Sequence, residues 1–139
     1  MLTDICTCKT SLTDPEALES WNGIVLGILS HGAATGGHLT RLIALSPDIA
    51  MGYAMTAHED AKRALLLGGA TEREQRWCAA LENWLNGKPT ASIARMEEAL
   101  ALNRADTISM KLSHGIRFML GDSLGMLRSV ERALGAHAA

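Results

Sequence analysis

Two stretches of this chain, WLNGKPTASIARMEEAL at Trp84–Leu100 and FMLGDSLGMLRSVERAL at Phe118–Leu134, lie 34 residues apart and share one pattern. In each, a bulky pair precedes a glycine, apolar residues follow at helical spacing, and an Ala-Leu pair closes the stretch. A glycine ends one helix and permits a tight turn, while a small alanine lets two helices cross closely. The pattern predicts two copies of an antiparallel helical hairpin, over about residues 73–135.

Apolar residues recur at three- and four-residue steps along nearly the whole chain, which predicts an all-α protein of about seven helices. Capping boxes at Thr13–Glu16 and Thr71–Glu74 mark two of the helix starts. Clusters of β-branched and aromatic residues typical of strands are missing. Helices are expected over about 13–31, 38–45, 48–67, 71–85, 90–100, 106–119 and 122–134.

The same spacing of glycine and Ala-Leu occurs at Gly32 with Ala44-Leu45, which predicts a third hairpin near the start of the chain. The long helix at 48–67 would then be inserted between the repeats. The spacing also occurs at Gly52 with Ala64-Leu65, inside that single predicted helix, where no hairpin can exist. The prediction of repeats therefore rests on the 34-residue match over many positions and not on the spacing alone.

The totals indicate one domain. The chain has 139 residues, of which 47% are hydrophobic, enough to bury a core without staples. We expect a single helical domain over 13–139, preceded by a flexible segment at 1–12 that contains Cys6 and Cys8. The net charge of −2 lacks the basic excess of a nucleic-acid binder. Neither a long apolar run nor a signal-peptide start is present, so we expect a cytoplasmic protein without membrane contact.

Several motifs resemble the tetratricopeptide repeat protein 38 family and occur in that family's order. The resemblance spans about residues 13–134 and is carried by Glu16-Ala17-Leu18, Ala44-Leu45-Ser46-Pro47-Asp48, Thr71-Glu72-Arg73-Glu74, Ala80-Leu81-Glu82-Asn83-Trp84, Met96-Glu97-Glu98-Ala99-Leu100, Lys111-Leu112-Ser113-His114, Phe118-Met119-Leu120-Gly121-Asp122 and Arg128-Ser129-Val130.

This resemblance implies a tetratricopeptide-repeat-like fold, a right-handed superhelix of paired helices. Members of the family are generally longer, so the chain is similar to their N-terminal portion, and the segment around Cys6 and Cys8 is not part of the pattern. The family brings no catalytic residue, cofactor or substrate. It implies a non-enzymatic helical-repeat protein that mediates protein–protein interaction or self-association.

Two alternatives stay open. One is a small metal-binding or catalytic helical domain that uses His58, His114 or the cysteines Cys6, Cys8 and Cys78. No other candidate ligand lies three or four residues from His114 on its helix, so we assign no catalytic, cofactor or metal residue. The other alternative is an N-terminal fragment of a longer repeat protein.

Two surfaces are candidates for binding. If the helices stack as in related repeats, Trp77 and Trp84 pack in the core and an inner groove suits a peptide of little charge. Seven residues would line that groove: Gln75, Cys78, Glu82, Ser109, Leu112, Ser113 and Ile116. The last helix carries four apolar residues with no following helix to cover them: Leu124, Leu127, Val130 and Leu134. Because solenoids need polar outer faces on their terminal repeats, we predict that a second copy covers this face in a homodimer.

Overall fold

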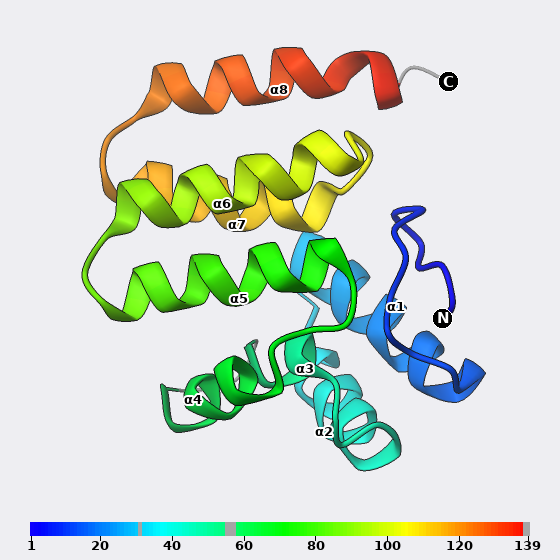
Figure 1. Ribbon diagram of the computed structural model, residues 1–139. Coiled ribbons are helices and arrows are strands. Elements are labelled where there is room, and N and C mark those ends of the chain that lie inside the picture. Colours follow the sequence, from blue (N-terminus) through cyan, green and yellow to red (C-terminus); the bar gives the residue numbers. More distant parts are fainter. Residues whose placement is uncertain (31, 55–57, 138–139) are drawn as a thin grey trace.

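A computed structural model describes residues 1–30, 32–54 and 58–137 of the chain. In these ranges the protein is all-α, as the sequence predicts, and its helices pack against one another (Figure 1). No helix there is long and apolar enough to cross a membrane. In chain order the helices are α1 (Pro15–Ser30), α2 (Thr35–Leu45), α3 (Ala50–Ala54), α4 (His58–Leu67), α5 (Glu72–Leu85), α6 (Pro89–Leu102), α7 (Thr107–Met119) and α8 (Ser123–His137).

The last four helices form two successive antiparallel hairpins, α5–α6 and α7–α8, which confirms the helical-hairpin prediction. Each hairpin turns at a glycine with positive φ, Gly87 at 67° and Gly121 at 71°. Residues with a side chain rarely adopt this backbone conformation, so glycine is favoured at both turns. The helix boundaries around the two glycines also repeat after 34 residues. Figure 1 shows α5, α6 and α8 as successive layers, with α7 beside α6.

The starts of α5 and α7 have the expected caps. The Thr71 side chain accepts the Glu74 N–H, and the Glu74 carboxylate accepts the Thr71 N–H, so the capping box is present. Asp106 caps α7 by accepting the Ser109 N–H. At α1 the cap differs from the prediction, because the Asp14 carboxylate, not Thr13, accepts the Glu16 N–H at 2.9 Å.

The first half departs from the predicted boundaries at the start of α2. α2 begins at Thr35 and includes Gly36 and Gly37, which were expected to precede it. The helix predicted over 48–67 is represented by α3 and α4, which pack against each other and both contact α5. Residues 55–57 of that prediction lie outside the described ranges.

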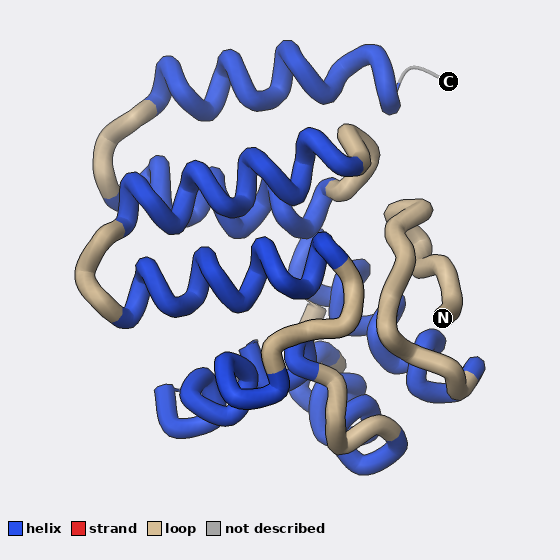
Figure 2. The backbone as a smooth tube through the Cα atoms, in the orientation of Figure 1, coloured by secondary structure: helices blue, strands red, loops and turns tan. Residues whose placement is uncertain are grey.

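The N-terminal segment is folded onto the helices, which differs from the flexible segment expected at 1–12. Thr3 and Lys9 form an isolated antiparallel bridge, and the loop runs alongside the helical body in Figure 2. Alternate residues along the segment are buried: Asp4, Cys6, Cys8, Thr10 and Leu12. The Asn103 side chain donates to the Cys6 carbonyl at 2.9 Å. This last contact joins residues 97 positions apart in sequence, so local composition carried no sign of it.

A buried arginine joins this segment to two helices. Arg73 of α5 is 5% exposed, and its Nη1 donates to Asp4 Oδ2 at 2.7 Å. Its Nε and Nη2 donate to the two carboxylate oxygens of Asp106, at 2.8 and 2.7 Å. The guanidinium lies 5.8 Å from the ring of Trp21 and 5.3 Å from the ring of Trp77, close enough for cation–π attraction. Burial in the core is therefore compensated by two carboxylates and two aromatic faces.

Replacing Asp4 with alanine should destabilise the fold. The change leaves Nη1 of Arg73 and Nε1 of Trp21, which both donate to the Asp4 carboxylate, without this partner in the core. Removal of one member of a buried ion pair costs about 3–5 kcal/mol, and urea denaturation followed by circular dichroism measures the loss. The exposed Glu19→Ala is the matched control, expected to change stability by less than about 0.5 kcal/mol. Equal stabilities of the two variants would show that the segment is not held through Asp4.

Candidate functional site

Four apolar side chains form a stripe along the solvent-facing side of α8. The opposite side of the helix, which faces the protein, carries Ser129 and Ala133 at 2% and 5% exposure. The four apolar residues are spaced by three, three and four positions, which places them on one helical face. We call them the outer stripe: Leu124, Leu127, Val130 and Leu134, exposed by 55%, 55%, 37% and 58%. These are the residues that the sequence analysis selected for self-association.

The repeat explains why this stripe is apolar. Helix α6 packs against α7. Three apolar residues of α6 are each only 7% exposed: Ile93, Met96 and Leu100. Their counterparts 34 residues further on belong to the outer stripe: Leu127, Val130 and Leu134. The outer stripe therefore has the composition of a helix-packing face, although it is exposed in this structure. Side chains of this kind, when gathered on a surface, mark sites of protein contact.

Other exposed apolar side chains precede α8, at the end of α7 and in the turn. Phe118, Met119 and Leu120 are 78%, 63% and 50% exposed. The counterpart of Phe118 in the first hairpin is Trp84, which is 43% exposed, whereas Trp77 is 2% exposed. The assignment of Trp77 to the core is correct, but Trp84 is partly exposed because it lies at the end of α5. The run of three apolar residues before Gly121 was the available sign of this surface.

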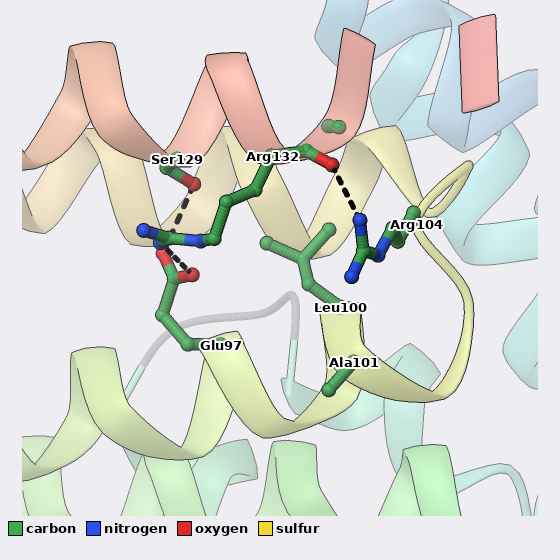
Figure 3. Close-up of a pocket in the computed structure, with 7 residues that line it drawn as sticks. Glu97, Leu100, Ala101, Arg104, Ser129 and Arg132 are labelled. Atoms are coloured by element: carbon green, nitrogen blue, oxygen red, sulfur yellow. Dashed lines mark hydrogen bonds and ion pairs between the residues drawn. The ribbon is translucent and has the colours of Figure 1, made fainter. Parts of the chain in front are cut away.

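An ionic network joins α8 to the preceding helices on its inner side. Glu97 of α6 accepts hydrogen bonds from Arg117, Ser129 and Arg132, with Arg132 Nη2 at 2.7 Å. Burial opposes ionisation of Glu97, but these hydrogen bonds outweigh it and lower its pKa. Figure 3 shows Glu97, Ser129 and Arg132 converging beside a small cavity of about 90 Å³ between α6 and α8. In the same view Arg104 donates to the Arg132 carbonyl at 3.1 Å.

The turn into α8 is fixed by a second carboxylate. Asp122 accepts the Gly125 N–H at 2.9 Å, a capping interaction at the start of the helix, and also pairs with Arg117. The Gly125 N–H and Arg117 lower the pKa of Asp122, so the cap is ionised at neutral pH. Arg117 therefore contacts both Glu97 and Asp122, which holds the orientation of α8 and leaves the outer stripe facing solvent.

The seven residues proposed for the inner groove do not gather at one place. Leu112 and Ile116 line an apolar groove of about 180 Å³, together with Trp77, Leu81, Trp84, Ser92 and Met96. Ser109 and Ser113 are buried, as is Cys78, so these three present no surface to a ligand. Ser109 instead accepts a hydrogen bond from Trp77 Nε1 at 2.8 Å. Gln75 and Glu82 are exposed outside the groove lining.

Among the side chains that the structure describes, those considered for metal binding or catalysis do not form a ligand set. Burial lowers the pKa of His114, which is half-buried. Burial also raises the pKa of Cys8 to about 12, so its thiol is protonated at neutral pH. Cys6 and Cys78 are buried free thiols. Among the residues that the structure describes, no three His, Cys, Asp or Glu side chains are placed to hold a metal ion. The structure describes the backbone of His58 but not its side chain.

Replacing Glu97 with glutamine tests the network that positions α8. Because folding lowers the pKa of Glu97, its ionised form stabilises the folded state at pH values above the usual pKa of 4.5. That contribution is lost as the pH falls through the lowered folded-state value. We therefore expect Glu97→Gln to be less stable than wild type at neutral pH. The difference in stability should shrink as the pH falls below the usual pKa of 4.5. Urea denaturation at a series of pH values measures it.

The neighbouring carboxylate provides the control for that experiment. Glu98 pairs with Arg76 and Arg95 at the surface, and all three side chains are 39–43% exposed. Exposed ion pairs contribute little, so Glu98→Gln should differ from wild type by less than about 1 kcal/mol. If the stability gap of Glu97→Gln is independent of pH, the carboxylate does not hold α8 through its charge.

Comparison with known proteins gives no match: neither a family model, nor a curated protein, nor a solved structure is significantly similar to this chain.

Proposed function

We propose that this chain is a non-enzymatic helical-repeat protein that acts through protein–protein contact, and that it associates with a second copy of itself. The observation that carries the proposal is the outer stripe of α8, an apolar face exposed along one side of the last helix. Three of its four members have buried counterparts in α6, so the stripe has the side chains of a surface that packs against another helix. The resemblance to the tetratricopeptide repeat protein 38 family supports the same reading.

The size of the stripe indicates a modest affinity. Complete burial of one Leu or Val side chain stabilises a contact by about 1.5–3 kcal/mol, and these side chains are already partly covered. A two-fold contact uses the same stripe from both copies, which doubles the gain. Association itself costs about 4–15 kcal/mol in lost freedom of motion. The gain and the cost are of similar size, so the association should be weak, and a dissociation constant on the order of micromolar is the tightest that we expect.

The proposed setting is the cytoplasm. All three cysteines are free thiols in the structure, as is usual for proteins of a reducing compartment. The proposal assigns no cofactor and no catalytic residue to the chain.

Replacing Leu127 with glutamate should break the self-association. The new charge would be placed in the middle of the apolar contact, so the dissociation constant should rise by at least about tenfold, equivalent to 1.4 kcal/mol. Light scattering after gel filtration, over a range of protein concentrations, measures the mass. Circular dichroism should show unchanged helix content, because Leu127 is exposed in the single chain.

A second exposed leucine gives the matched control. Leu66 of α4 is 88% exposed and lies on a different helix. Leu66→Glu makes the same chemical change without touching the outer stripe, so it should associate as wild type does. A wild-type chain that stays monomeric at several hundred micromolar, about a hundred times the tightest constant expected, would overturn the proposal.

A further inference from the structure

The outer stripe is symmetric in sequence about one residue. Leu124 and Val130 lie three residues before and after Leu127, and Leu120 and Leu134 lie seven residues before and after it. Within α8, at about 100° per residue, Leu124 and Val130 lie about 60° to either side of Leu127, and Leu134 lies about 20° from it. Leu120 precedes the helix, in the turn, and is 50% exposed. The apolar pattern therefore reads the same in both directions from Leu127.

Such a pattern is self-complementary when two helices run in opposite directions. A two-fold axis through Leu127 would place it against Leu127 of the second copy and Leu124 against Val130 of the second copy. Leu134 would then reach the turn that carries Leu120 in the second copy. Each apolar residue meets another apolar residue, as an isologous contact requires.

The charge beside the stripe distinguishes this arrangement from a parallel pair. Glu131 lies within the span of the stripe, about 40° from Leu127 around the helix. In a parallel pair it would face Glu131 of the second copy, and two like charges would meet at an apolar contact. In the antiparallel pair it lies opposite Ser123 of the second copy, the first residue of α8. The partial positive charge at a helix N-terminus favours a carboxylate there.

We propose that two copies of this chain pair through antiparallel α8 helices, with the two-fold axis at Leu127. This inference rests on the proposed self-association and adds its orientation and register. The axes of two helices in contact are about 8–10 Å apart. The two Leu127 residues, which face each other at the two-fold axis, therefore come within disulfide distance. In this register two Leu124 positions are separated by six residues along the helix direction, about 9 Å, which is too far for a disulfide.

Disulfide trapping of full-length variants that each carry one added cysteine tests the register. Leu127→Cys should cross-link with itself under mild oxidation. Leu124 and Val130 of the second copy lie about 60° to opposite sides of the contact line, so their Cα atoms are about 7–9 Å apart. A short thiol-reactive cross-linker should therefore join Leu124→Cys to Val130→Cys when the two variants are mixed, and should join either variant alone much less readily. Non-reducing gel electrophoresis measures the covalent dimer. Wild type is the control for the native thiols, which are buried and should give no dimer band.

The outcomes separate the orientation from the association itself. If Leu124→Cys cross-links alone as readily as in the mixture, the pair is parallel and the inference is wrong, while self-association stands. If Leu127→Cys gives no covalent dimer although light scattering finds dimers, the axis lies elsewhere and the inference is again wrong. If wild type is monomeric, the proposed function fails and the inference fails with it. A covalent dimer from Leu127→Cys and from the mixture supports the antiparallel pair.

Discussion

The charge of Arg73, held in the core, is the interaction on which the rest of the structure depends. An arginine remains charged in protein, so burial is tolerated only where its donors are paired. Here the pairs come from the N-terminal segment through Asp4 and from the start of α7 through Asp106. Three separate parts of the chain are thereby held at one point. Movement of any of them would leave an uncompensated charge in the core.

The two C-terminal hairpins extend from this point towards the outer surface. α5 carries Arg73 and α7 begins beside it, so the ion pairs fix the two first helices of the hairpins relative to each other. The contacts of α8 are different, because Glu97, Arg117 and Asp122 lie closer to solvent than Arg73 does. The last helix is consequently held on its inner side by charges and is left apolar on its outer side. This asymmetry is the basis of the proposed self-association.

Sequence reasoning succeeded where the signals are local. The turns at Gly87 and Gly121, the capping box at Thr71 and the cap at Asp106 each involve residues within a few positions of one another. The outer stripe was also visible, since its members share one face of one helix. The groove lining was not, because burial of Ser109, Ser113 and Cys78 depends on the angle at which neighbouring helices cross.

The sequence by itself determined the helices of this protein, their pairing into hairpins and the 34-residue repeat. Helix hydrogen bonds, caps and glycine turns join residues that are close in the chain, so their pattern is written in short stretches. The tertiary structure alone decided that residues 1–12 fold onto the helices, and it decided which side of α8 meets solvent. The pairing of Asp4 with Arg73 spans 69 residues, and no periodicity or spacing connects two charges that meet only after the helices have packed.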